Sequence, residues 1–261
     1  MPELVTEDAV LHVEVDGEGR PVTVLAHGLT NNCRELAAFT QFVPGTKVRF
    51  CFRGHGHSSA PETGYRFADL ARDVDAVARA YGATCAGGTS MGAGAISNLL
   101  CREPDRFERL VFLLPAGLDV PFPHKERFLE TAAAIEGKTP HELLEAIVSD
   151  PARLGRYLET PWRRAVDEAL WEHLHPEGVA RAIREVIEDF PVPDRELLRR
   201  VTAPTLLICV EGDPIHPAEL GRILADLMPN AELLLFPGEE ALYGAIPELV
   251  AKVSAFLGEA A

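Results

Sequence analysis

A serine between two glycines carries the clearest chemical signal in the sequence. Residues 88–92 read Gly-Thr-Ser-Met-Gly and match the pattern Gly-x-Ser-x-Gly. The pattern follows a run of small residues typical of a buried strand and opens a helical pattern, which is the strand–turn–helix setting of a nucleophile elbow. Glycines suit such a sharp turn because neighbouring backbone passes close to it, and the following helix N-terminus stabilises developing negative charge. We therefore predict that Ser90 is a nucleophile; a structural serine in a glycine-rich connection is the alternative.

A carboxylate and an imidazole follow a later apolar run. Asp213 comes just after the buried strand predicted at 205–210. In that place a carboxylate can orient a base, although an acidic residue there can also serve only as a turn or helix-cap residue. His216 lies three residues further along the same loop, so it is a candidate base for Ser90 with Asp213 as its partner.

The hydrophobic pattern predicts strands that alternate with helices around these residues. The chain starts as a predicted hairpin, in which a turn at 16–19 joins strands at 10–15 and 22–26. Further strands are predicted at 47–52, 83–88, 110–114, 205–210 and 231–236, and helices at 34–42, 67–81, 93–101, 217–228 and 246–257. This alternation implies an α/β fold with a mostly parallel sheet covered on both faces.

One long stretch interrupts the alternation. Residues 118–200 are helical in pattern, broken by prolines and without a convincing strand. An insertion over one edge of the sheet is the simplest explanation. We therefore predict an α/β core made of residues 1–117 and 201–261, with residues 118–200 as a helical cap.

Four landmarks together resemble the α/β-hydrolase fold family, in the branch with a helical cap. They are His27-Gly28 at the end of an early strand, Arg-Gly-His-Gly-His-Ser at 53–58, the serine motif at 88–92, and Glu-Gly-Asp-Pro-Ile-His-Pro at 211–217. The resemblance covers nearly the whole chain. It implies a twisted, mostly parallel sheet flanked by helices, with an inserted cap.

The same resemblance implies roles for individual residues. Ser90 corresponds to the nucleophile and Asp213 to the acid of the catalytic triad. The backbone N–H groups of Leu29 and Met91 correspond to the oxyanion hole. Donors aimed at a developing oxyanion commonly contribute about 3 kcal/mol each.

The sequence departs from the family in one respect, because family members carry the catalytic histidine in the loop after the last strand. Here that loop, residues 236–245, contains no histidine, and the last histidine of the chain is His216. A serine hydroxyl is a poor nucleophile without a base. Besides His216, the base could be Glu239 or Glu240, if burial raises the pKa of the carboxyl. The pair could equally be the solvated start of a helix. His27, beside the oxyanion strand, is the third candidate, although a histidine there is ordinarily structural in this family.

The residues predicted to line a substrate pocket come from three parts of the chain. They are His27, Gly28, Glu239, Glu240 and Trp162, with Trp171, Phe122 and Phe128 as further aromatic candidates from the cap. Most of the cap aromatics could equally form the core of the cap.

Three functions fit these residues. The first is a serine hydrolase that cleaves an ester, thioester or related acyl bond of a small apolar substrate through Ser90 and a non-standard base. The second is a non-hydrolytic enzyme, a lyase or cyclase, in which Ser90 and the oxyanion N–H groups polarise a carbonyl, since one fold hosts many activities. The third is a binding protein that uses the capped pocket as a receptor.

Composition narrows the partners. Lysine and arginine number 25 and aspartate and glutamate 40, which gives a net charge of −15. Such an acidic chain repels phosphate backbones and anionic lipids, and its apolar runs are too short to span a bilayer. Its first residues lack the pattern of a signal peptide. We expect a cytoplasmic protein that acts on a small molecule, with no nucleic-acid or membrane partner; a homodimer is compatible with the fold.

Cysteine and histidine spacing provides no metal or cofactor signature. The five cysteines are scattered without a CxxC pair, so neither a zinc site nor a disulfide framework is indicated. His55 and His57 have the spacing of metal ligands, but no third ligand accompanies them. Neither a dinucleotide fingerprint nor a P-loop is present. We therefore expect no metal and no cofactor.

Overall fold

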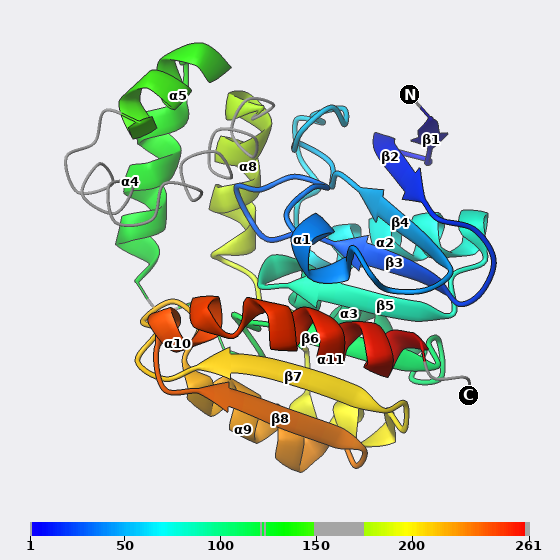
Figure 1. The fold of residues 1–261 in the computed structure, drawn as a ribbon. Coiled ribbons are helices and arrows are strands. Elements are labelled where there is room, and N and C mark those ends of the chain that lie inside the picture. Colours follow the sequence, from blue (N-terminus) through cyan, green and yellow to red (C-terminus); the bar gives the residue numbers. More distant parts are fainter. Residues whose placement is uncertain (1, 121, 123, 149–174, 259–261) are drawn as a thin grey trace.

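The strands of the computed structural model form a single sheet in the order β1-β2-β4-β3-β5-β6-β7-β8 (Figure 1). The structure describes residues 2–120, 122, 124–148 and 175–258. Within them the strands are β1 (Glu3–Val5), β2 (Val10–Asp16), β3 (Val22–Ala26), β4 (Thr46–Phe50), β5 (Cys85–Thr89), β6 (Arg109–Leu113), β7 (Thr205–Val210) and β8 (Ala231–Phe236). β2 pairs antiparallel with β1 and β4, and all other neighbours are parallel. The predicted α/β class with a mostly parallel sheet is confirmed.

The helices follow the strands in the alternation that the sequence predicts. They are α1 (Ala37–Thr40), α2 (Phe67–Tyr81), α3 (Met91–Arg102), α4 (Lys125–Ile135), α5 (Pro140–Val148), α8 (Pro176–Val186), the 3₁₀ helix η1 (Arg195–Arg200), α9 (Ala218–Leu227), α10 (Glu239–Gly244) and α11 (Ile246–Gly258). α2 has the predicted bounds because Leu70 and Val74 lie on its buried face and Gly82, in the left-handed conformation, ends it.

Helices cover both faces of the sheet. α2, α3 and α9 bury their apolar residues against one face, and α11 covers the other through Leu249, Val253 and Leu257; Figure 1 shows α11 crossing in front of the strands. β7 is buried at every position because it lies between these layers. The central strands are therefore fixed, and the loops at their carboxyl ends start from rigid positions.

α4, α5 and α8 lie together beyond one end of the sheet (Figure 1). α4 packs on α8 through a separate apolar cluster that includes Ala132, Ile135, Val179 and Ile183. α8 and the turn after it are also bonded to the loop before α2, because Glu185 accepts the N–H groups of Gly64 and Tyr65 and Asp189 that of Phe67. These helices belong to the segment predicted as a cap; the boundaries of that segment stay a prediction.

The predicted N-terminal hairpin is wrong. β4 lies between β2 and β3, so these two strands are not paired with each other. Both edges of the buried strand β3 are taken by parallel neighbours, β4 and β5, and β2 pairs with the outer edge of β4 instead. The turn at 16–19 reverses the chain as its glycines predict, but it does not determine which strand lies next to β2.

Smaller differences concern the extent and the number of the elements. The helix predicted at 34–42 is reduced to α1, because side chains of the preceding residues bond back to the loop: Asn32 accepts the N–H of Arg34, and Glu35 accepts that of Gly28. β1 and α10 are additional elements. No helix within the described ranges is both long enough and apolar enough to cross a bilayer.

Candidate active site

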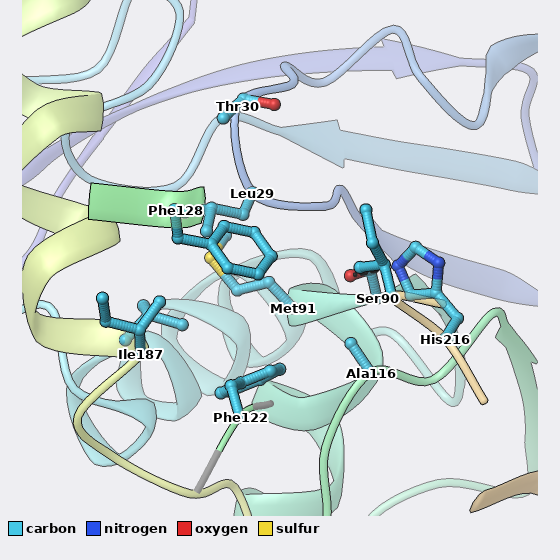
Figure 2. Close-up of a pocket in the computed structure, with 11 residues that line it drawn as sticks. Leu29, Thr30, Ser90, Met91, Ala116, Phe122, Phe128, Ile187 and His216 are labelled. Carbon is cyan, nitrogen blue, oxygen red and sulfur yellow. Dashed lines mark hydrogen bonds between the residues drawn. The ribbon is translucent and has the colours of Figure 1, made fainter. Parts of the chain in front are cut away.

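Ser90 sits at a strained turn between β5 and α3, and Figure 2 shows its side chain beside that of His216. Its backbone has φ +49° and ψ −111°, a conformation that is costly for a residue with a side chain. The flanking glycines allow the turn. A Cβ on Gly92 would lie 2.2 Å from the carbonyl oxygen of Ala26, and one on Gly88 would lie 2.6 Å from the nitrogen of Ala93. The predicted elbow is therefore present, with a steric reason for both glycines.

One chain of hydrogen bonds joins Asp213, His216 and Ser90. The Nδ1 of His216 lies 2.9 Å from Oδ2 of Asp213, and its Nε2 lies 3.0 Å from Oγ of Ser90. An ionised carboxylate only accepts hydrogen bonds, so Nδ1 carries the proton and Nε2 is left to accept the hydroxyl of Ser90. The structure thus brings together the three residues that the sequence nominates as nucleophile, base and acid.

His216 and Asp213, the predicted base and acid, come from a single turn after β7. Oδ1 of Asp213 accepts the backbone N–H groups of Ile215 and His216, at 2.8 and 3.0 Å, which curls the chain so that the two side chains meet. Burial opposes ionisation of Asp213, but the hydrogen bonds from the side chain and backbone of His216 outweigh it and lower its pKa to about 2. Asp213 is therefore an anion at neutral pH.

The two residues predicted to form the oxyanion hole lie beside Ser90. Leu29 follows β3 and Met91 opens α3, and both residues line the cavity beside Ser90. Among the described residues no acceptor takes either N–H, which is the state that an oxyanion hole requires. The pair that the family resemblance nominates thus lies next to Ser90.

A largely apolar cavity of about 220 Å³ opens at Ser90. Three of its described lining residues, Thr30, Ser90 and His216, carry polar side chains (Figure 2). The other described residues of the wall are apolar: Leu29, Met91, Ala116, Phe122, Phe128, Val186, Ile187 and Ile215. Because Phe128 belongs to α4 and Val186 to α8, the cavity lies between the sheet and the helices beyond its end.

Several predicted pocket residues lie elsewhere. Phe122 and Phe128 do line the cavity, whereas Trp162 and Trp171 lie outside the described residues. Gly28 stands behind the wall, against the Cβ of Ser90. Glu239 and Glu240 are not on the cavity wall either: they form the exposed first turn of α10, where the helix N-terminus favours negative charge without burial.

His27 is not a pocket residue, because it is buried next to the loop that contains Leu29. Its Nε2 accepts the N–H of Phe52 at 3.0 Å, so Nδ1 carries the proton and donates to the carbonyl of Gly28 at 2.7 Å. Burial and the neighbouring His55 hold the pKa of His27 well below its usual range. With both ring nitrogens engaged and 1% of the residue exposed, His27 has a structural role.

Sequence reasoning missed part of the cavity wall and one carboxyl group. Val186 and Ile187 end α8 and its buried stripe, and nothing local distinguishes them from other core residues. Ile215 stands beside His216 and could have been included with it. Glu35 falls in the helix predicted at 34–42, yet its carboxylate turns back onto the loop that contains Leu29.

One set of donors in the described part of the chain has the spacing of metal ligands. Ligand atoms of His12, Glu14 and Cys33 lie within 4.8 Å of one another. Glu14 already pairs with Arg34 and Arg49, and none of the three residues lines the cavity at Ser90. The arrangement around Ser90 is complete without this set.

The chain belongs to the α/β hydrolase fold family, because the sequence model of that family matches residues 48–243. It is 28% identical to the 2-(acetamidomethylene)succinate hydrolase of Mesorhizobium japonicum over 93% of this chain and 89% of that protein. It is 27% identical to the pimeloyl-[acyl-carrier protein] methyl ester esterase of Chromobacterium violaceum over 87% of this chain and 89% of that protein. Its fold matches the enol-lactonase of Burkholderia xenovorans with a TM-score of 0.79 and 23% identity, over 99% of this chain and 100% of the other.

Proposed function

We propose that the protein is a serine hydrolase that cleaves an ester, thioester or related acyl bond. The observation that carries the proposal is the unbroken chain of hydrogen bonds from Asp213 through His216 to Ser90. The names of the relatives, an esterase and a hydrolase, agree with this class of reaction. His216 takes the place of the histidine that the loop after β8 lacks.

The acylation step follows from the positions of these groups. Oγ of Ser90 attacks the substrate carbonyl while its proton passes to Nε2 of His216, and Asp213 stabilises the imidazolium that forms. The carbonyl oxygen becomes an oxyanion that accepts the N–H groups of Leu29 and Met91. The C–O or C–S bond then breaks, and the leaving group takes the proton from His216. An acyl-enzyme on Ser90 is left.

The second half of the cycle uses the same groups with water in place of the alcohol or thiol. His216 takes a proton from water, the resulting hydroxide attacks the acyl carbon, and the oxyanion again lies between Leu29 and Met91. Collapse of the intermediate breaks the bond to Ser90, which recovers its proton from His216. The products are a carboxylic acid and regenerated enzyme.

The cavity wall favours a small, uncharged acyl group. Apart from Thr30, Ser90 and His216 the described lining is apolar, and it includes no lysine, arginine, aspartate or glutamate. Transfer of a charged substrate group into such surroundings costs free energy unless an opposite charge meets it. An apolar acyl chain gains about 25 cal/mol for each Å² that it buries.

A fluorophosphonate tests the proposal without knowledge of the natural substrate, because this reagent phosphonylates only an activated serine. Intact mass should show a single adduct on the wild-type protein and none on Ser90→Ala. His216→Ala should label at least a hundredfold more slowly, since general-base catalysis contributes about 10²–10⁴-fold. Glu240→Gln, which changes the first turn of α10 after β8, should label at the wild-type rate.

The outcomes separate a hydrolase from the two other candidate functions. A folded wild-type protein that forms no adduct and hydrolyses no activated ester contradicts the proposal and favours a non-hydrolytic enzyme or a receptor. Labelling that persists in His216→Ala but is lost in Glu240→Gln would assign the base to the loop after β8.

A further inference from the structure

The carboxylate of Glu35 lies against the loop that carries Leu29, and the hydrolytic cycle leaves it without a role. Its Oε2 accepts the N–H of Gly28 at 2.6 Å, and its Oε1 accepts the side-chain amide of Asn31. A Cβ added to Gly28 would lie 3.3 Å from Oε1 of Glu35 and 3.5 Å from Cβ of Ser90. The side chains of Glu35 and Ser90 therefore both lie close to Gly28.

The bonds around Gly28 decide where the Leu29 N–H points. That N–H belongs to the same peptide unit as the carbonyl of Gly28, and in a trans peptide the two point in opposite directions. The carbonyl accepts Nδ1–H of His27 at 2.7 Å and the N–H of Asn31 at 3.2 Å. On the other side of the same residue, Glu35 holds the Gly28 N–H. Because glycine has little conformational preference of its own, these external bonds orient it.

The surroundings of Glu35 fit its anionic form. Both carboxylate oxygens face donors, whereas a protonated acid would direct its hydrogen at one of them. Burial raises the pKa of Glu35 to about 7, against the opposing effect of the hydrogen bonds from Gly28 and Asn31. Arg34, its neighbour in the chain, directs its guanidinium to Glu14, and the titratable group beyond Ser90 is His216. The carboxylate and the acid therefore exchange near neutral pH.

We propose that Glu35 is a positioning residue of the oxyanion hole: as a carboxylate it holds the Gly28–Leu29 peptide so that the Leu29 N–H faces the reacting carbonyl. The inference rests on the proposed role of Ser90. It adds a group, outside the triad, whose ionisation controls the rate. Protonation of Glu35 weakens the bond to Gly28 and releases the loop.

The test compares the wild-type protein with Glu35→Gln on an activated ester. The quantity measured is the wild-type kcat/KM divided by that of the variant, across about pH 5–9. Ser90, His216 and Asp213 are unchanged in both proteins, so their contribution cancels in the ratio. Well above pH 7 the wild type should be about tenfold faster, through kcat rather than KM, because an oxyanion interaction acts in the transition state. Below pH 7 the ratio should fall towards one, since a protonated Glu35 resembles glutamine. A contribution to folding alone would leave the ratio independent of pH.

Two further variants secure the result. Asn31→Ala removes one hydrogen bond to the carboxylate, so the pKa of Glu35 should rise. The activity that depends on ionised Glu35 should then appear at a higher pH in this variant than in the wild type, and this comparison does not require Glu35→Gln to fold. Asp69→Asn is the matched control, because Asp69 also accepts a backbone N–H, from Arg66 at the start of α2, and should not change the pH profile. A wild-type protein that is inert to the fluorophosphonate overturns both proposals. Normal labelling with a ratio that does not change with pH overturns this one alone.

Discussion

At the scale of single residues, the site depends on the two oxygens of Asp213 having different partners. Oδ1 is occupied by the backbone N–H groups of Ile215 and His216, and Oδ2 faces Nδ1 of His216. The backbone bonds hold the carboxylate so that a single orientation serves the imidazole. The tautomer of His216, and with it the basicity of Nε2 towards Ser90, follows from this arrangement.

Asp213→Asn should therefore abolish most activity without unfolding the protein. The amide oxygen takes the place of Oδ1, because that position faces two N–H donors, and the NH₂ group then faces Nδ1 of His216. The proton of the imidazole moves to Nε2, which can no longer accept from Ser90. We expect kcat to fall about 10⁴-fold in steady-state assays with an activated ester. A variant within tenfold of the wild-type rate would show that His216 works without its partner.

The sequence identifies the reacting residues better than the residues that surround them. Ser90, Asp213 and His216 stand in a recognisable motif or directly after an apolar strand, so short-range pattern is sufficient. Glu35 has no such signal, because its role arises when the side chain turns back over seven residues to Gly28. Val186 is one apolar residue in a helix, and only the packing of that helix over the sheet brings it to the cavity.

At the scale of elements, the elbow is a close crossing of two segments. The start of α3 passes the end of β3 so closely that a Cβ on Gly92 would lie 2.2 Å from the Ala26 oxygen and 2.8 Å from that of His27. Both contacts are with backbone, which cannot rotate away as a side chain can. The separation of the two elements is thus set by the absence of a side chain at position 92.

Gly92→Ala should force β3 and α3 apart. We expect the free energy of unfolding to fall by about 1–3 kcal/mol, as for an overpacked core, and labelling of Ser90 by the fluorophosphonate to slow. Urea denaturation and intact mass measure the two effects. Gly244→Ala is the control, since a Cβ there meets nothing within 4 Å, and it should be neutral or slightly stabilising in α10. Equal stability of Gly92→Ala and the wild type would contradict the steric account.

At this scale the sequence predicts the strands but not which strands lie next to each other. The pattern locates β2 and β3 correctly and even the turn between them, because alternation and glycines are local features. It cannot tell that β4 enters between them, since that pairing depends on which strand offers a parallel partner to the buried β3. The predicted bounds of α2 and β8 match the observed ones, because α2 has a clear apolar face with a glycine cap and β8 contains the apolar run Leu233–Phe236.

At the scale of the whole molecule, a buried arginine ties separate parts together. Arg53, which follows β4, is 1% exposed and pairs with Asp73 of α2 and with Asp8 before β2. It also donates to the carbonyl of Gly64, in the loop that Glu185 of α8 holds through backbone N–H groups. The sheet, α2 and the helices over the cavity thus share one set of polar contacts.

Asp73→Asn should destabilise the protein as a whole. It leaves the guanidinium of Arg53 buried with one carboxylate fewer, and broken buried pairs commonly cost about 3–5 kcal/mol. We expect a loss near the lower limit, because Asp8 still faces Arg53. Chemical denaturation provides the measurement, and Glu196→Gln, from the exposed pair with Arg199, should change stability by less than about 0.5 kcal/mol. A loss of that small size for Asp73→Asn would contradict the role of Arg53.

Because one turn after β7 contains both Asp213 and His216, the two side chains move together. In a triad drawn from three loops, two separations between independently moving segments must be kept. Here the proposed acid and base lie on one turn, so only the separation between this turn and Ser90 has to be maintained. In the proposed mechanism the described elements that follow, from α9 to α11, contribute packing and no reacting group. The exposed first turn of α10, which lines no part of the cavity, can therefore change without altering a group of that mechanism.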